Sequence, residues 1–295
     1  MELKNIYMPI MEDLTQVEAK IREQIHFLTA GHKFVNEIVG FFFDNPGQRL
    51  RPALVILSAC AAFENEKKQG KELPYSEDVI MLATIVEYLH SASLIHDDVV
   101  DEAVSRRGKP SMNVQFKNKI SVLAGDMLYS HAFALLTDRF DKKIMKILSQ
   151  CVQKMCRGEI NELRECDFEQ YLGILEDKTA VFMSACCNAG ATVAVKSGNP
   201  GGVRALADFG LNLGMVYQMV DDLKDGDAPI PVTGVYREKL VKKLNEFVRG
   251  AEENLSVLHD SVYKESLANL LRYIIEQHIE IKDLVSCRSV NLGGK

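Results

Sequence analysis

The sequence predicts an all-α fold in a single domain, and three observations support this. Apolar residues recur along nearly the whole chain with the period of about 3.6 residues that marks one face of a helix. Alternating runs of the kind that form strands are scarce. No fixed repeat and no low-complexity linker divides the 295 residues. One domain over residues 1–295, with a core at about 10–285, is therefore the simplest organisation.

The first predicted helices span residues 11–30 and 34–43, where apolar residues recur at positions i, i+3 and i+4. The sequence DNPGQR then interrupts the pattern at 45–47. Pro52 suits the first turn of the next helix, which reads ALVILSACAAF. The charged segment 64–78 contains a glycine and a proline, and it is expected to form a surface loop.

A long, buried helix is predicted next, followed by the sequence RRGKPS, which is expected to form a loop. The turn KSGNPGG later separates two further helices. The amphipathic C-terminal third is expected to form an outer layer, and the tail RSVNLGGK is expected to be loose. The predicted helical segments of this part of the chain are 76–102, 121–136, 142–157, 175–195, 205–223 and, within the C-terminal third, 236–285.

Composition excludes several classes of protein. With 47% hydrophobic residues the chain can bury a large core, and its net charge of −6 provides no basic field for nucleic acid. The N-terminal sequence MELKNIYMPIMEDLTQ lacks the features of a signal peptide, and no run of about 18 apolar residues predicts a transmembrane segment. The seven cysteines lack CxxC spacing. We expect them to be reduced, buried residues of a cytoplasmic protein.

A cluster of acidic residues ends the long helix, in the sequence HSASLIHDDVVDEAVSRRG. Asp97 and Asp101 are four residues apart and therefore share a helical face, with Asp98 about 100° away. Carboxylates this close repel each other unless a cation lies between them, and Mg²⁺ is held by such carboxylates together with substrate phosphates. Arg106 and Arg107 follow, and arginine binds phosphate oxygens through two hydrogen bonds. The stretch predicts a site for Mg²⁺ and a diphosphate.

A second copy of the same spacing strengthens this interpretation. A single DDxxD motif is more often a solvated helix face than a metal site. The sequence YQMVDDLKDGD, however, places Asp221, Asp222 and Asp225 in the same pattern after another apolar helix. The two clusters could face each other across one cavity and hold several Mg²⁺ ions around one diphosphate.

The sequences HSASLIHDDVVDEAVSRRGKPS, VLAGD and QMVDDLKD closely resemble the signature regions of the trans-type isoprenyl (polyprenyl) diphosphate synthases, over residues 47–225. The resemblance implies a helical bundle around a central cavity and a homodimer. It also implies condensation of an allylic diphosphate with isopentenyl diphosphate, with about three Mg²⁺ ions in each site. The diphosphate of the allylic substrate leaves, the double bond of isopentenyl diphosphate attacks the allylic cation, and a proton is lost.

The resemblance also implies roles for individual residues, some of which would otherwise be interpreted as surface or core positions. Lys178 alone would be taken for a surface lysine, and His90 for a core histidine. The implied metal ligands are the six aspartates Asp97, Asp98, Asp101, Asp221, Asp222 and Asp225. The implied ligands of the allylic diphosphate are Arg106, Lys178, Thr179 and Gln218. The implied ligands of isopentenyl diphosphate are Gln48, Arg51, His90 and Arg107. The implied catalytic set is Asp97, Asp98, Asp101, Lys178, Asp221 and Asp222.

Two departures from the pattern of the family affect these expectations. Gln48 stands where the family has a lysine, and the loss of one charge-assisted contact weakens binding by about 1.5–3 kcal/mol, or roughly ten- to a hundred-fold. The loop after Asp225 is short and has no lysine before Lys239. Both changes suggest weak affinity, an unusual acceptor or a partner chain that completes the site.

The residues before the first aspartate motif are expected to set the length of the product. Ala92 and Ser93, five and four residues before Asp97, are small, and Tyr88 lies one turn deeper. Small side chains leave an apolar tunnel open, so the sequence predicts a product longer than fifteen carbons.

Two other functions are compatible with the motifs. A terpene cyclase, or a prenyltransferase with another acceptor, would account for Gln48, but the arginines and histidine of the second pocket argue against a cyclase. A regulatory subunit of a hetero-oligomeric synthase is the non-enzymatic alternative, although such a chain would be expected to lose some of its six motif aspartates.

Overall fold

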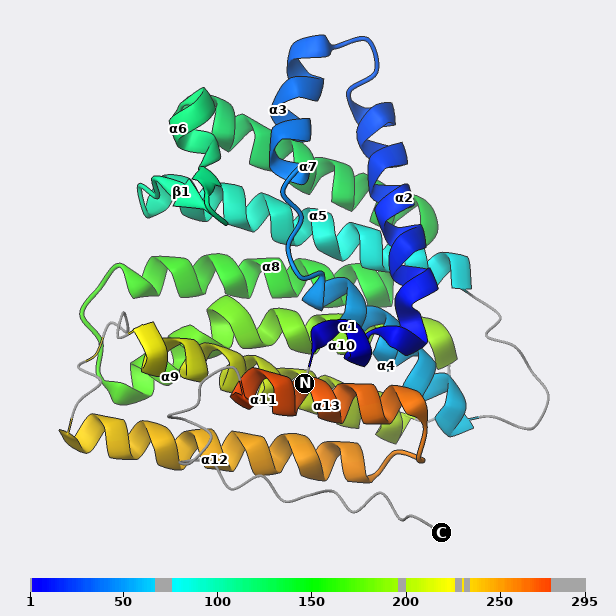
Figure 1. Ribbon diagram of the computed structural model, residues 1–295, viewed down its shortest axis with the longest axis vertical. Helices are drawn as coiled ribbons and strands as arrows, with labels where there is room; N and C mark the ends of the chain where they lie inside the picture. Colours follow the sequence, from blue (N-terminus) through cyan, green and yellow to red (C-terminus); the bar gives the residue numbers. More distant parts are fainter. Residues whose placement is uncertain (1, 67–75, 196–199, 226–229, 231–233, 277–295) are drawn as a thin grey trace.

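The computed structural model describes residues 2–66, 76–195, 200–225, 230 and 234–276, and these residues form an almost entirely helical assembly (Figure 1). The all-α prediction is confirmed. In chain order the elements are α1 (Leu3–Ile6), η1 (Met8–Ile10), α2 (Met11–Leu28), α3 (Lys33–Phe43), α4 (Leu50–Glu66), α5 (Ser76–Val100), β1 (Ser105–Arg106), β2 (Lys109–Pro110), α6 (Met112–Phe116), α7 (Asn118–Arg139), α8 (Lys142–Glu162), α9 (Phe168–Leu175), η2 (Glu176–Ala180), α10 (Val181–Val195), α11 (Pro200–Asp225), α12 (Gly234–Ser256) and α13 (Val262–Glu276).

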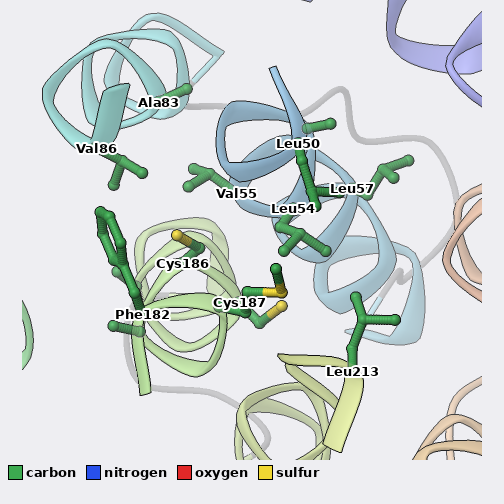
Figure 2. Close-up of a cluster of buried hydrophobic side chains, with 14 of the residues drawn as sticks. Leu50, Leu54, Val55, Leu57, Ala83, Val86, Phe182, Cys186, Cys187 and Leu213 are labelled. Carbon is green, nitrogen blue, oxygen red and sulfur yellow. The ribbon is translucent and has the colours of Figure 1, made fainter. Parts of the chain in front are cut away.

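Helices α4, α5, α10 and α11 form the centre of the molecule, because their side chains are apolar on nearly every face. Figure 2 shows Leu54 and Val55 of α4, Val86 of α5 and Phe182 of α10 in one buried cluster. Helix α10 approaches α4 so closely that a Cβ atom on Gly190 would lie 2.2 Å from the carbonyl oxygen of Val55. A side chain at position 190 would therefore push the two helices apart.

Helix α2 crosses α5, and the hairpin of α2 and α3 extends beyond α5 at the top of Figure 1. The turn between its two helices includes Gly31 at a φ of 77°, which favours glycine. The Thr29 hydroxyl hydrogen-bonds with the Asn36 side chain across the turn, at 2.9 Å. The Tyr88 hydroxyl donates to the carbonyl oxygen of Ile21 at 2.8 Å, which attaches α2 to α5.

The segment after α5 is a small hairpin where the sequence predicted a loop. Ser105 pairs with Pro110 and Arg106 with Lys109, so that Arg107 and Gly108 form a two-residue turn. Both turn residues have positive φ, 52° and 76°, as a type I′ turn requires. The hairpin fixes the direction in which the two arginines leave the end of α5.

The helix predicted over 175–195 is helical throughout, but it contains a π-helical turn at 176–180 and is preceded without a gap by a further helix. The chain forms α9, which the sequence pattern did not reveal, then the π-helical turn η2, then α10. Asp167 begins α9 with a capping box that includes Gln170. An apolar pattern passes through this turn because residues on both sides of it are buried.

The remaining expectations for the helices are confirmed within the described residues, with boundaries that shift by a few positions. The C-terminal layer is α12 and α13, and residues 277–295, which include the end of the layer predicted over 236–285 and the tail 288–295, lie outside the described residues, as do 67–75 and 196–199. Four of the six described cysteines are buried, whereas Cys156 is exposed and Cys166 is partly exposed, so the expectation of uniformly buried cysteines was wrong for these two.

Two helices are long and apolar enough to cross a membrane by length and composition alone, within the described residues. They are residues 77–100 and 118–139. In the first, 83% of the apolar window is buried inside the protein, as expected for a core helix; in the second the share is 33%. Such helices are weak evidence for a membrane protein, because core helices pass the same test.

Candidate active site

The first acidic cluster occupies the last turn of α5 and the turn that follows. The amide of Asp101 donates to the carbonyl oxygen of Asp97 at 2.8 Å, so the helical spacing between them is maintained. Burial, together with the negative charges of Glu159 and Asp101, raises the pKa of the Asp97 carboxyl to about 7, although the positive charges of Lys178 and Arg106 oppose part of the rise. The ionised form of Asp97 is therefore only partly compensated by nearby positive charges, and a bound divalent cation would stabilise it.

Asp98 has a different environment from Asp97. Its side chain is buried, and Arg106 donates to it from both Nε and Nη2 at 2.7–2.9 Å. This bidentate pair places the arginine of the hairpin against the end of α5. Arg106, an expected diphosphate ligand, thus lies beside the first acidic cluster, and its guanidinium neutralises Asp98.

The second acidic cluster ends α11. Asp222 is buried, and it accepts hydrogen bonds from the Tyr171 hydroxyl and, at 3.1 Å, from Gln218 Nε2. The side-chain oxygen of Gln218 accepts in turn from the Thr179 hydroxyl at 3.1 Å. Burial raises the pKa of Asp222, and these hydrogen bonds offset part of the rise. Asp225 is the last residue of α11, and its side chain lies outside the described part of the structure.

Helix α8 and the π-turn η2 connect the two acidic clusters. Lys178 of η2 pairs with Glu162 and, at 3.1 Å, with Glu159, both from α8. Lys178 and Glu159 act electrostatically on Asp97, and Glu162 acts on Asp222. The C-terminal ends of α5, α8 and α11 lie on the same side of the molecule, at the left of Figure 1. The two clusters therefore belong to one neighbourhood.

Lys178 is expected to be protonated and lies between the two acidic clusters, as an anion-binding lysine would. Burial alone would lower its pKa, but the hydrogen bond with Glu162 and the charge of Glu159 raise it overall. Lys178 can lie so close to α8 because residue 158 is glycine: a Cβ atom there would be 2.7 Å from the Lys178 backbone nitrogen. The two glutamates were not predicted from the sequence, although their spacing of three residues places them on one helical face.

A second pocket, rich in arginine, lies beside the first turn of α4. Its cavity of about 510 Å³ is lined by all four of the residues expected to bind the second diphosphate: Gln48, Arg51, His90 and Arg107. Its wall also includes three residues that sequence reasoning missed: Arg49, Glu87 and Tyr217. Each is adjacent to an expected residue or within one helical turn of it, and this spacing is the signal that could have identified them.

Arg51 and His90 form the centre of this pocket. Arg51 Nη1 lies 3.0 Å from His90 Nε2, and the guanidinium lies over the Phe182 ring at 5.4 Å. Burial lowers the pKa of His90 well below its usual range, and the positive charges of Arg51 and Arg107 lower it further. Neutral His90 can therefore accept from Arg51. The buried Nε of Arg51 has no hydrogen-bond partner among the described residues.

A buried carboxylate compensates the positive charges of this pocket. Glu87 is 4% exposed and pairs with Arg49, which also pairs with Glu18 of α2. Arg49 has a positive φ of 53°, so the chain turns sharply as it enters α4. Arg51 and Arg107 act electrostatically on the same carboxylate. Glu87 is thus the common counter-ion of an arginine cluster.

The residues expected to set product length form a buried column on α5. Ala92 is completely buried, and Tyr88 lies one turn below it with no exposed surface. The Tyr88 ring packs edge-on against Phe43 at 5.7 Å and against the His131 imidazole at 5.5 Å. Ser93 donates its hydroxyl to the His90 carbonyl oxygen at 2.9 Å. Small residues therefore lie above an aromatic group of Phe43, Tyr88 and His131, of which only Tyr88 was expected.

The chain matches the family model described as polyprenyl synthetase over residues 32–234. It is 30% identical over 283 residues to the octaprenyl diphosphate synthase of Escherichia coli, covering 94% of this chain and 81% of that protein. It is 31% identical over 271 residues to that of Haemophilus influenzae, covering 90% and 76%. The chain belongs to the polyprenyl synthetase family, and it is a prenyltransferase.

Solved structures agree with this assignment. A decaprenyl diphosphate synthase from Rhodobacter capsulatus superposes with a TM-score of 0.80 at 26% identity, covering 94% of this chain and 99% of that one. A polyprenyl synthase from Caulobacter crescentus, complexed with calcium and isoprenyl diphosphate, has a TM-score of 0.78 at 22% identity, covering 92% and 97%, and it supports the fold. The resemblance inferred from the sequence motifs is confirmed.

Proposed function

We propose that the chain condenses an allylic diphosphate with isopentenyl diphosphate to give a medium- or long-chain polyprenyl diphosphate. The observation that supports this proposal is the set of contacts between Asp97 and Asp222: Glu159 acts on Asp97, Glu162 acts on Asp222, and Lys178 pairs with both glutamates. An arginine-rich second pocket next to this site suits a second diphosphate. The relatives described as octaprenyl and heptaprenyl diphosphate synthases support the same reaction.

The carboxylates suit Mg²⁺, although within the described residues no three His, Cys, Asp or Glu side chains already form a complete metal cluster. Such a site is compatible with an ion that takes only one or two protein carboxylates and completes its shell with phosphate oxygens and water. The raised pKa of Asp97 shows that its carboxylate is destabilised in the folded chain, and a bound cation would offset that destabilisation. Bound ions would neutralise the departing diphosphate. Three ions would be held by Asp97, Asp98, Asp101, Asp221, Asp222 and Asp225.

The remaining polar residues fall into two groups, and each group would bind one of the two substrates. Arg106, Lys178, Thr179 and Gln218 would hold the allylic diphosphate and stabilise the charge that develops as its C–O bond breaks. Gln48, Arg51, His90 and Arg107 would hold isopentenyl diphosphate with its double bond directed toward the allylic carbon. The small Ala92 and Ser93 side chains would leave room for a product longer than fifteen carbons.

The test is to incubate the purified chain with Mg²⁺, isopentenyl diphosphate and allylic primers of several lengths, and to size the products. Elongated diphosphates longer than fifteen carbons are expected. Hydrocarbons or alcohols formed without consumption of isopentenyl diphosphate would indicate the cyclase alternative. The absence of turnover with every primer would indicate a regulatory subunit. One relative, from Bacillus subtilis, is described as component 2 of a heptaprenyl diphosphate synthase, so adding a partner chain is an informative second arm.

The Ala92→Phe variant is expected to shorten the product by one or more isoprene units. A ring at this buried position, one turn above Tyr88, would close the path of the growing chain. Chromatography of the hydrolysed products measures the change, and Ala134→Phe, at an exposed position of α7, is the matched control. An unaltered product length would show that the residues of this α5 column do not line the path of the growing product.

The Gln48→Lys variant is expected to lower the Michaelis constant for isopentenyl diphosphate. A lysine there adds a charge-assisted contact of about 1.5–3 kcal/mol to the cavity that Arg51, His90 and Arg107 line. The Michaelis constant for the allylic primer is expected to stay the same, because the primer uses the other pocket. If the constant for isopentenyl diphosphate is unchanged or higher, Gln48 does not contact that substrate.

Assembly and compartment are parts of the same proposal. A homodimer is consistent with the exposed apolar side chains of α7, where Leu123 is 66% exposed and Val122 is 40% exposed. The six described cysteines are free thiols, which suits a cytoplasmic enzyme. Light scattering of the purified chain tests the dimer.

A further inference from the structure

We propose that Arg157 is a positioning residue for the allylic diphosphate: through Asp177 it holds the π-helical turn η2, which carries Lys178 and Thr179. This inference rests on the proposed function, in which Lys178 and Thr179 bind that diphosphate. Arg157 belongs to α8, and its side chain is 59% exposed, so it would ordinarily be taken for a surface residue.

The turn η2 is a part of the chain whose shape needs support from outside. A π-helical turn departs from the regular hydrogen-bond ladder of an α-helix, and such turns are frequent at functional sites. Three consecutive residues of the turn are attached to neighbouring helices: Asp177 and Lys178 to α8, and Thr179 to α11. The directions of the Lys178 and Thr179 side chains therefore depend on these attachments.

Arg157 joins α8 to Asp177 through two parallel hydrogen bonds. Its Nε donates to one carboxylate oxygen at 2.6 Å, and its Nη2 donates to the other at 2.7 Å. Such a bidentate pair fixes orientation as well as distance. Asp177 is 7% exposed, so the loss of Arg157 would remove two hydrogen bonds from a buried carboxylate, which is costly.

The next residue of α8, Gly158, brings the backbones of α8 and η2 into contact at the same point. A Cβ atom on Gly158 would lie 2.7 Å from the Lys178 backbone nitrogen and 3.1 Å from Asp177 Cβ. The ammonium of Lys178 pairs with Glu159 and Glu162 of the same helix. Because Asp177 immediately precedes Lys178, release of the turn from α8 would change the direction from which Lys178 approaches these glutamates and a bound diphosphate.

Two other roles for Arg157 must be distinguished from this one. An arginine that contacts the diphosphate itself would contribute whether or not Asp177 is present. An arginine that only stabilises the fold would lower the stability of the whole chain, and substrate binding by the folded molecules would stay the same. A positioning residue would instead change the turn and diphosphate binding together, and its effect would depend on Asp177.

The experiment compares Arg157→Met, Asp177→Asn and the double variant, together with Arg157→Lys, which keeps the charge but loses the planar fork. Arg139→Met is the matched control, because Arg139 of α7 also pairs with a carboxylate of another helix, that of Asp78, at 2.6 Å. Amide hydrogen exchange of residues 174–182 measures the stability of the turn without any ligand. Calorimetry with inorganic diphosphate and Mg²⁺ measures anion binding without turnover, and the Michaelis constants for both substrates are then determined.

We expect the amides of the turn to exchange several-fold faster in Arg157→Met than in the wild type or in Arg139→Met. Binding of inorganic diphosphate with Mg²⁺ should weaken roughly ten-fold, because small misplacements of binding groups have effects of this size or larger. The Michaelis constant for the allylic primer should rise, and that for isopentenyl diphosphate should stay the same. Arg157→Lys should retain part of the binding, and the double variant should lose no more than Arg157→Met alone.

Unchanged exchange in the turn, unchanged diphosphate binding, or losses that add up in the double variant would each overturn the inference, as would a lower overall stability as the only effect. Absence of diphosphate binding by the wild type would overturn both the inference and the proposed function. If the wild type binds diphosphate with Mg²⁺ but elongates no primer, the proposed function fails, while exchange and binding still decide the role of Arg157.

Discussion

The Asp97→Asn variant is expected to lose roughly three orders of magnitude in kcat and, without metal, to be at least as stable as the wild type. The loss of rate follows because a carboxylate that holds the metal stabilises the leaving diphosphate by several kcal/mol, and each 1.36 kcal/mol changes the rate ten-fold. The stability follows because burial, together with the charges of Glu159 and Asp101, makes the ionised Asp97 unfavourable before metal binds. Asparagine has the same shape without the charge.

The same carboxyl predicts a dependence on pH. Its pKa is raised from 3.8 to about 7 in the folded chain, so folding favours its protonated form. This contribution to stability is fully present below the unfolded value and is lost as the pH rises through about 7. The stability advantage of Asp97→Asn should therefore grow between pH 5.5 and pH 8.

Urea unfolding with a metal chelator present measures this difference. Asp138→Asn, at an exposed position of α7, is the control and should show neither effect. A variant that retains its activity would contradict the assignment of Asp97 to the metal site. A variant that is less stable at pH 8 than the wild type would contradict the electrostatic explanation.

The Glu87→Gln variant is expected to lose about 1–3 kcal/mol of unfolding free energy, because Arg49 loses the buried one of its two carboxylate partners. Burial raises the pKa of Glu87, so the loss of its own buried charge offsets part of a larger cost. Arg49 would retain only Glu18, and the charges of Arg51 and Arg107 would lose their common counter-ion. Binding of isopentenyl diphosphate should suffer as well, since Arg49 and Glu87 form part of that pocket.

Two further variants make this prediction specific. Glu18→Gln removes the partly exposed partner of Arg49 and should cost about 1 kcal/mol or less. The double replacement Arg49→Met with Glu87→Met removes both charges, and it should be closer to the wild type than Glu87→Gln. If Glu87→Gln and Glu18→Gln are equally stable, the buried pair has no special role.

Most of the helices could be predicted from the sequence, because they depend on local spacing, whereas the roles of the site residues remain predictions. The apolar period identified α5, α7 and α11, and the DDxxD spacing identified two acidic clusters whose neighbours Glu159 and Glu162 both pair with Lys178. Gln48, Arg51, His90 and Arg107 line one cavity, as expected from the resemblance. Their roles in binding substrate remain a prediction.

The features that the sequence did not predict depend on contacts between distant segments. The Asp98–Arg106 pair requires the hairpin turn at Arg107, and a residue pattern gives no signal of a positive φ at an arginine. The Tyr171–Asp222 hydrogen bond joins residues 51 positions apart. Glu159 and Glu162 resemble an ordinary solvated helix face until Lys178 is placed between them.

The π-helical turn η2 has a consequence for how one continuous stretch of chain can serve two pockets. Each residue of an α-helix advances the side-chain direction by about 100°, and a π-turn inserts extra chain without ending the helix. Tyr171, before the turn, reaches the end of α11, whereas Phe182, after it, lies beside Arg51 and His90. A deletion of one residue within 176–180 would rotate α10 by about 100° relative to α9. The chain could then keep either the contact of Tyr171 with Asp222 or the contacts of Phe182 with Arg51 and His90, but not both.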